Sequence, residues 1–313
     1  MKLSIVSTLY HSSPYIADFH QRISTAASQL AGDDYEIIFV NDGSPDDSLE
    51  LVVQLSKTDP HVVVVDLSRN FGHHKAIMTG LDYTSGEMVF LIDSDLEEEP
   101  EWLLSFLEQL EREKCDVVYG VQESRKGGWF ERLSGKWFYY FLTKITGMEI
   151  PPNMVTARLM TRHYVDALLM HREREVFLGG LFFITGFHQQ GQHVKKLSTS
   201  ETTYTLKRKL SLLINCVTSF SASPLIGIFY FGITTSILAG IYIAYLTIKW
   251  LVFSNTASGW TSVIVSIWLF GGLISFFIGI VGIYLSKVFS ETKLRPYTIV
   301  KRVYGRDKPS SVN

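Results

Sequence analysis

The stretch "VFLIDSDLEEEPEWL", residues 89–103, places six carboxylates within nine positions directly after a short apolar run. Like charges this close repel one another, so a chain needs a reason to hold them at the end of a strand. An acidic, solvated start of a helix is one such reason, and a bound divalent cation is another.

Apolar runs on both sides of this stretch alternate with helical patterns. Strands are predicted at 3–9, 35–42, 61–68, 87–93 and 116–121, and helices at 14–31, 47–57, 72–85 and 98–113. Strands that are apolar throughout and separated by helices indicate a parallel sheet that is covered on both faces. The predicted fold class is therefore α/β, with a Rossmann-like, mostly parallel sheet.

Polar residues follow three of the predicted strands, at Asn41-Asp42, at Arg69-Asn70 and from Asp93 to Asp95. Ligands of such sheets bind beyond the carboxyl ends of the strands. Asp93 and Asp95 can face one cation, because Mg²⁺ or Mn²⁺ takes one or two carboxylates and fills its other positions with phosphate oxygens and water. We predict a metal site at these two residues, with Glu97 as a further candidate ligand.

The other acids of the stretch have a different expected place. Glu98, Glu99 and Glu101 are predicted to lie in the first turn of the next helix, where negative charge favours the helix dipole. The histidines show no metal-ligand spacing and are expected in surface or packing positions; they include His73, His74, His188 and His193.

The composition of the 313 residues narrows the class of protein. With 29 basic and 31 acidic residues the chain has no overall basic surface, which argues against a dedicated nucleic-acid binder. Cys115 and Cys216 lie far apart and are expected to be buried thiols in a reducing compartment. The first ten residues resemble a strand and not a secretory signal.

Two late segments, 225–248 and 261–285, contain no charged residue and are each long enough to cross a membrane as a helix. Basic residues flank the pair, whereas the connecting loop 249–260 holds only Lys249. The basic residues before the pair include Lys195, Lys196, Lys207, Arg208 and Lys209, and those after it include Lys287, Lys293, Arg295, Lys301 and Arg302. Positive flanks of this kind predict that both ends face the cytoplasm.

These features predict four parts: a cytoplasmic catalytic domain at 1–203, an amphipathic juxtamembrane helix at 204–224, two transmembrane helices within 225–286, and a basic cytoplasmic tail at 287–313. The tail stretch "KLRPYTIVKRVYGR", residues 293–306, is expected to return to the membrane surface. The expected location is the bacterial inner membrane, with several spans and the catalytic domain in the cytoplasm.

The segments "VNDGSPDDS" (40–48) and "LSRNFGHHKAIMTGLDYTSGEMVFLIDSDLEEEPEWL" (67–103), with the two late spans, resemble family 2 glycosyltransferases of the polyprenyl-phosphate type. The resemblance covers nearly the whole chain. It implies a GT-A catalytic domain, a UDP- or GDP-linked sugar donor, a polyprenyl phosphate acceptor and Mg²⁺ or Mn²⁺. A homo-oligomer is left open.

The resemblance also implies roles for single residues. Asp42 resembles the aspartate that contacts the base or ribose, Asp93 the one that faces the ribose and diphosphate, and Asp95 the direct metal ligand. Glu97 stands near the metal, where the family usually has glutamine. Arginines that hold the acceptor phosphate and the diphosphate in the family correspond to Arg125, Arg132 and Arg158. The family also has a basic segment that closes over the nucleotide, and Lys207 and Lys209 lie in the corresponding segment here.

The function that this implies is inverting transfer of one sugar to undecaprenyl phosphate at the cytoplasmic leaflet, for cell-surface glycans such as lipopolysaccharide O-antigen. The chain departs from the family at Gln122, where an arginine is common, and at Asn153 and Thr156, which replace aspartates. These departures leave the acceptor and the donor sugar open.

Two alternatives follow from these departures. The acceptor of the first is a hydroxyl of a lipid-linked saccharide, which requires a carboxylate base such as Glu173 or Glu175. The second alternative is a catalytically silent membrane scaffold that binds a nucleotide without turnover.

Overall fold

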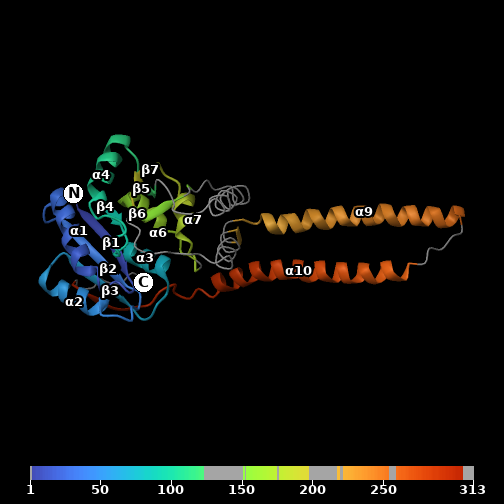
Figure 1. Ribbon diagram of the computed structural model, residues 1–313, viewed down its shortest axis with the longest axis horizontal. Coiled ribbons are helices and arrows are strands. Elements are labelled where there is room, and N and C mark those ends of the chain that lie inside the picture. The colour runs from blue at the N-terminus through green and yellow to red at the C-terminus, as the bar shows by residue number, and fades with distance from the viewer. Residues whose placement is uncertain are drawn as a thin grey trace. The chain divides into compact units, whose positions relative to one another are not determined.

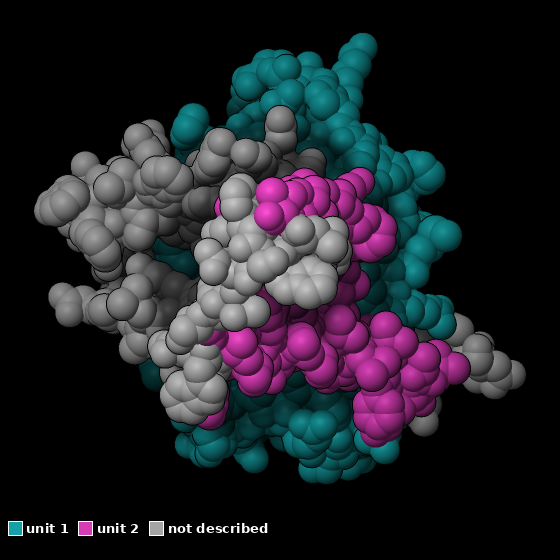
Figure 2. Space-filling view, turned by 90° about the vertical axis from the view of Figure 1, so that its right-hand side faces the viewer, with its two compact units in different colours: residues 1–140, 148–204, 295–313 teal, residues 141–147, 205–294 magenta. Residues whose placement is uncertain are grey.

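The structure is a computed structural model, and it describes residues 2–122, 151, 153–174, 176–196, 217–218, 221–253 and 259–305. The chain divides into two compact units, which Figure 2 distinguishes by colour. Unit 1 consists of residues 1–140, 148–204 and 295–313, and unit 2 consists of residues 141–147 and 205–294.

The described part of unit 1 contains one mixed sheet of eight strands, in the order β7-β5-β6-β4-β1-β2-β3-β8 (Figure 1). The strands are β1 Leu3–Leu9, β2 Tyr35–Asn41, β3 Val62–Leu67, β4 Met88–Leu91, β5 Val117–Gln122, β6 Met154–Thr161, β7 Gln189–Val194 and β8 Val300–Tyr304. Strands β4, β1, β2 and β3 are parallel neighbours, and β7 is parallel to β5. Strand β6 runs antiparallel to β4 and β5. The prediction of a mostly parallel sheet is confirmed.

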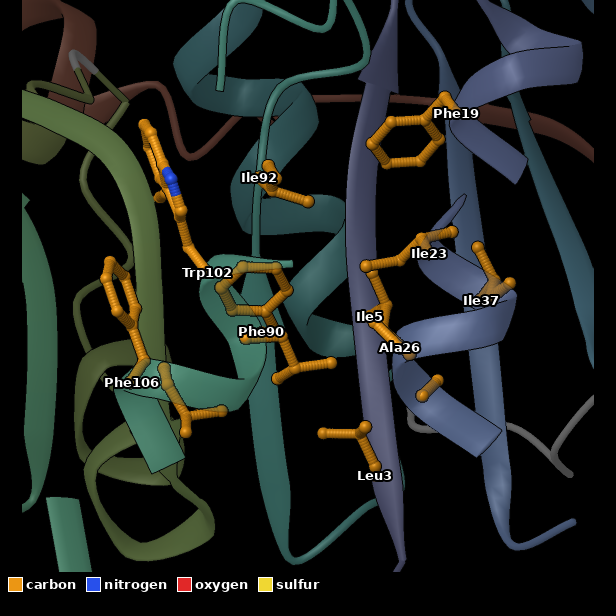
Figure 3. Close-up of a cluster of buried hydrophobic side chains, with 14 of the residues drawn as sticks. Leu3, Ile5, Phe19, Ile23, Ala26, Ile37, Phe90, Ile92, Trp102 and Phe106 are labelled. Atoms are coloured by element: carbon orange, nitrogen blue, oxygen red, sulfur yellow. The ribbon is translucent and has the colours of Figure 1, made fainter. Parts of the chain in front are cut away.

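Helices cover both faces of this sheet. They are α1 Ile16–Ala31, α2 Ser48–Thr58, α3 His73–Asp82, α4 Trp102–Glu113, α6 Arg162–Leu169 and α7 Leu178–Ile184. Helix α1 buries Phe19, Ile23 and Ala26 on one face, and Figure 3 shows these side chains beside Ile5 of β1. Helix α3 covers the other face, where Gly80 approaches the side chain of Val6. Apolar residues three and four apart give helices of this kind their buried stripe.

The helix predicted at 98–113 begins later than expected, at Trp102. The chain bends through residues 93–101 instead of entering a helix. Leu96 has a positive φ of 58°, and the buried carboxylate of Glu98 accepts a hydrogen bond from the backbone of Thr156. Placing Glu98 in a helical first turn was therefore wrong, because a contact from another strand fixes it in the turn.

The segment after the second late span joins the sheet. Strand β8 pairs antiparallel with β3 along the sheet edge, with Val303 opposite Val65. Thr298 Oγ1 lies 2.8 Å from Thr79 Oγ1, and Lys301 Nζ lies 3.8 Å from the carboxylate of Asp66. Residues 300–304 of the basic tail are thus a strand of the catalytic sheet, which the sequence pattern did not predict. An open edge of β3 would leave backbone groups unpaired, and β8 supplies their partners.

Unit 2 contains two long apolar helices, α9 Ser223–Phe253 and α10 Trp260–Thr292 (Figure 1). Each holds a stretch that is long and apolar enough to cross a membrane, Ser223–Tyr242 with a mean hydropathy of 1.8 and Ser266–Thr292 with 2.1. The two helices contact each other through Phe231 of α9 and Phe277 of α10, whose ring centroids lie 5.4 Å apart. The amphipathic helix expected at 204–224 lies mostly outside the described residues.

The end of β8 depends on Gly305, which has a φ of +80° and lies against the carbonyl oxygen of Val62. A Cβ there adds a clash to the backbone strain, so we expect Gly305→Ala to lower the free energy of unfolding by about 2–4 kcal/mol. Gly32 is the control, because its φ is +58° but nothing lies within 4 Å of its Cβ position. Gly32→Ala should cost only ~1 kcal/mol. Denaturant unfolding of the full chain in detergent measures the free energy of unfolding of both variants. Equal decreases in the two variants would contradict the close packing of Gly305 against Val62.

Candidate active site

The acidic turn, defined as residues 93–98, follows β4 and is fixed to the end of β1. Ser94 is buried, and its Oγ lies 3.0 Å from the carbonyl oxygen of Thr8 and 3.0 Å from Ser12 Oγ. The backbone N–H of Glu97 donates to Asp95 Oδ1 at 3.0 Å. Burial and the nearby charge of Asp93 raise the pKa of Asp95 above its ordinary value. The fold therefore crowds two carboxylates at a place where added positive charge would stabilise both.

Lys196 approaches the acidic turn from the residues after β7. Its Nζ lies 3.0 Å from Glu97 Oε2 and 4.0 Å from Glu98 Oε1. Burial disfavours the charged form of this lysine, but the carboxylates of Glu98, Glu97 and Asp95 outweigh it and raise the pKa of Lys196. Lys196 therefore contributes positive charge directly beside the turn.

Glu98 is fully buried beneath the turn. Its Oε1 accepts a hydrogen bond from the Thr156 N–H at 2.9 Å, and its Oε2 has no hydrogen-bond partner in the part of the chain that the structure describes. Burial, followed by the charge of Asp93, raises the pKa of Glu98 to about 8. The carboxyl group of Glu98 is therefore largely protonated near neutral pH.

A small pocket of about 150 Å³ lies at the ends of β1 and β2. It is lined by Thr8, Leu9, Tyr10, Asp42, Asn70, Gly72 and His73. The carboxylate of Asp42 accepts hydrogen bonds from the N–H groups of Phe71 at 2.7 Å and Gly72 at 3.0 Å. Burial raises the pKa of Asp42, although these two bonds oppose the shift. Asp42 thus holds the loop before α3 as well as lining the pocket.

His73, the first residue of α3, links the pocket to the acidic turn. Its Nδ1 lies 3.0 Å from Thr8 Oγ1, and its Nε2 lies 3.5 Å from Asp93 Oδ1. The expectation of a surface or packing role missed this position, because no metal-ligand spacing marks it. The signal in the sequence was its place directly after the polar loop that begins at Arg69-Asn70.

Arg158 lies on β6, directly opposite Leu91 of β4 in the sheet. The side chain is buried, and its guanidinium carbon lies 3.2 Å from the centre of the Phe182 ring. Nε donates to the carbonyl oxygen of Thr156 at 3.2 Å, while Nη1 has no hydrogen-bond partner among the described residues. Burial lowers the pKa of Arg158 to about 10, so it remains charged at neutral pH.

The structure brings Asp42, Asp93, Asp95, Glu97 and Arg158 to the same end of the central strands. Several other predicted residues lie outside the described part of the chain, namely Arg125, Arg132, Lys207, Lys209 and Glu175. Glu173 lies in the half-buried segment between α6 and α7. Sequence reasoning missed Lys196, Glu98 and His73.

The described residues contain no group of three or more His, Cys, Asp or Glu side chains arranged to hold a metal ion. The Asp93 and Asp95 pair nevertheless fits Mg²⁺ or Mn²⁺, because these ions often use one or two carboxylates and take their other ligands from substrate phosphates and water. Burial and the nearby charge of Asp93 raise the pKa of Asp95 even though Lys196 opposes the shift, so a bound cation would stabilise its carboxylate. This donor set suits a metal that binds together with a diphosphate.

Comparison with known proteins assigns the family. The sequence pattern of "Glycosyl transferase family 2" matches residues 4–169. A glycosyltransferase of Mycobacterium tuberculosis is 49% identical over 316 residues, covering 100% of this chain and 92% of that protein. The bactoprenol glucosyl transferase of Shigella phage SfX is 31% identical, covering 96% and 99%. The chain therefore belongs to glycosyl transferase family 2 and is a glycosyltransferase.

The expected fold and enzyme class are both confirmed, since the Rossmann-like, mostly parallel sheet is that of a GT-A domain. Among solved structures, glucosyl-3-phosphoglycerate synthase from Mycobacterium tuberculosis has a TM-score of 0.47 at 18% identity, covering 70% of this chain and 80% of that chain. The alternative of a catalytically silent scaffold is not supported, because the chain belongs to an enzyme family and keeps the paired carboxylates Asp93 and Asp95.

The buried carboxyl of Glu98 makes stability depend on pH. Its pKa is about 8 in the folded protein against an ordinary 4.5, so between these values the folded state keeps a proton that the unfolded chain has released. Stability should therefore fall as pH rises from about 4.5 to about 8. Glu98→Gln stays neutral and should remove this loss.

Thermal melts in EDTA from pH 5 to 8 measure the effect. The stability of Glu98→Gln should rise relative to wild type as pH increases. Glu113→Gln is the control, because that exposed side chain forms an ion pair with its neighbour Arg112. If the melting temperatures of wild type and Glu98→Gln change with pH in the same way, the carboxyl group of Glu98 is not protonated in the folded protein.

Proposed function

We propose that the chain transfers a single sugar from a nucleotide-diphospho-sugar to a polyprenyl phosphate, with inversion, at the cytoplasmic leaflet of a bacterial inner membrane. The proposal rests on the position of Asp93 and Asp95 in the turn after β4, where Asp93 lies 3.5 Å from His73 of the Asp42 pocket. It rests also on membership of glycosyl transferase family 2 and on the two helices of membrane-spanning length among the described residues. The product would feed synthesis or modification of cell-surface glycans.

The donor would lie across the ends of β1, β2 and β4. Asp42, Asn70 and His73 line the pocket and offer hydrogen-bonding groups to the nucleoside. Asp93 and Asp95 would hold Mg²⁺ or Mn²⁺ against the diphosphate, whose departing negative charge the ion would stabilise. In the structure Glu97 pairs with Lys196, so it is a less direct metal ligand than the two aspartates.

A phosphate acceptor fits the charges of this site. A phosphate monoester has a second pKa of about 6, so it is largely dianionic near neutral pH and needs no general base. What the protein must supply is positive charge that holds the nucleophile. The unpartnered Nη1 of Arg158 is one donor for a phosphate oxygen, and Arg125 and Arg132 are further candidates from the sequence. Direct attack of the phosphate inverts the anomeric carbon.

The lipid part of the acceptor is supported by two observations. The described helices α9 and α10 have the length and hydropathy of membrane spans, and basic residues flank the pair. The Shigella phage SfX relative, which aligns over nearly its whole length, is named a bactoprenol glucosyl transferase. Lys207 and Lys209 lie before the spans, where they could close over the bound nucleotide.

The direct test is a donor screen with purified full-length protein in detergent. Undecaprenyl phosphate and Mg²⁺ or Mn²⁺ are incubated with a panel of UDP- and GDP-sugars, and lipid products are read by mass spectrometry. We expect one donor to give undecaprenyl phosphate plus one sugar. A product formed only on a lipid-linked saccharide, with none on the phosphate, would overturn the proposal in favour of a hydroxyl acceptor.

Replacing the paired aspartates should stop transfer without unfolding the protein. We expect Asp95→Asn to lower kcat by about a thousandfold or more and Asp93→Asn by nearly as much, because each removes negative charge that would hold the cation. Glu99→Gln is the matched control from the same acidic stretch and should keep near wild-type turnover. Steady-state rates in saturating Mn²⁺ test the assignment of Asp95 as a metal ligand. Near wild-type turnover in Asp95→Asn would reject that assignment.

The nucleophile can be identified from the pH dependence of the rate. With a phosphate acceptor, kcat/KM should rise through a pKa of about 6 and then level off. Glu173→Gln should keep most activity, since no carboxylate base is needed. Arg158→Lys should raise the acceptor KM, because lysine cannot pair two phosphate oxygens as the planar arginine does. An essential Glu173 together with a dispensable Arg158 would instead indicate a hydroxyl acceptor.

A further inference from the structure

Lys196 has a contact that the proposed chemistry does not use. Its ammonium group lies 3.0 Å from Glu97 Oε2, and its side chain is only 23% exposed. The lysine comes from the end of β7, while Glu97 lies in the acidic turn after β4, so two separate parts of the sheet meet at this ion pair. A half-buried lysine held by carboxylates is a fixed positive charge, and its partner Glu97 lies two residues along the chain from Asp95.

A fixed ammonium group has two physical effects on a cation at Asp93 and Asp95. It repels the cation, because like charges a few ångströms apart interact strongly in a partly buried site. It also occupies Glu97, whose carboxylate would otherwise be a third oxygen ligand close to the aspartates. Glu98 does not take the place of Glu97 in this respect, because its side chain is fully buried and its Oε1 already accepts the N–H of Thr156 on β6. Both effects weaken metal binding.

We propose that Lys196 is a positioning residue that holds Glu97 away from the metal and so limits the protein's own metal ligands to Asp93 and Asp95. Metal affinity is then low in the empty enzyme and becomes high only when the donor diphosphate adds its oxygens. Such a site also releases the metal with the nucleoside diphosphate after transfer, because two carboxylates alone retain it weakly. This inference rests on the proposed function, in which the two aspartates bind Mg²⁺ or Mn²⁺.

A purely structural role for Lys196 makes the opposite prediction. If the ion pair only braced the acidic turn against β7, its removal would disorder the aspartates and weaken metal binding. If the lysine competes with the metal, its removal tightens binding. The direction of the change therefore separates the two roles, and a gain in affinity is an outcome that a damaged turn does not produce.

The experiment measures Mn²⁺ binding to purified full-length protein by calorimetry, without donor. We expect Lys196→Gln to lower the Kd for Mn²⁺ at least about tenfold, because it removes both the repulsion and the ion pair that Lys196 makes with Glu97. Lys196→Arg keeps the charge and should remain near wild type. Lys195→Gln is the matched control, because the neighbouring Lys195 is exposed. Adding Glu97→Gln to Lys196→Gln should remove most of the gain.

Each outcome bears on a definite claim. Unchanged or weaker Mn²⁺ binding in Lys196→Gln, or no binding in either protein, overturns the role of Lys196. Asp95→Asn distinguishes this failure from a failure of the proposed function: if it abolishes Mn²⁺ binding, the metal site stands whatever Lys196 does. If Asp95→Asn binds Mn²⁺ as wild type does, the metal site and the inference fail together. Lys196→Met, which keeps the alkyl chain, repeats the test should the glutamine variant melt early.

Discussion

Negative charge at the end of β4 is the constraint on which this site depends. Asp93, Asp95 and Glu97 lie within one short turn, and a fold that gathers them must supply compensating groups. The chain does so from β6 and the end of β7, through the Thr156 N–H and the ammonium group of Lys196. It neutralises Glu98 by burial instead. The carboxylates of Asp93 and Asp95 remain, and a bound cation would stabilise both of them.

The two halves of the sheet contribute different parts of this arrangement. The parallel strands β1 and β2 end at the pocket that Asp42 and His73 line, and His73 reaches from there to Asp93. The strands beyond β4 bring the counter-charges, because antiparallel pairing places Arg158 opposite Leu91. At the far edge β8 completes the sheet with residues that follow the apolar helices in sequence. A chain cut before α9 would therefore lack both its apolar helices and one strand of its catalytic sheet.

The sequence predicts the parallel core well, since β1 to β4 are mostly apolar runs and the polar residues at the ends of β2 and β4 locate Asp42, Asp93 and Asp95. It does not predict β7, whose "QQGQHV" has no apolar run, or β8, which resembles a basic tail. Glu98 could not be placed from local pattern either. Its burial depends on Thr156, 58 residues further along the chain, and local charge alone favoured a helix start. Contacts between distant strands carry no periodic signal.

The position of the metal tests this account most directly. Crystals of the full chain grown with Mn²⁺ and a nucleoside diphosphate would show the ion by its anomalous scattering. The account predicts one peak between the diphosphate and the acidic turn, within about 2.1–2.2 Å of an Asp95 carboxylate oxygen. It also predicts that the Lys196 ammonium group still contacts Glu97. A diphosphate bound in the pocket with no Mn²⁺ at Asp95, or with the ion held elsewhere, would contradict it.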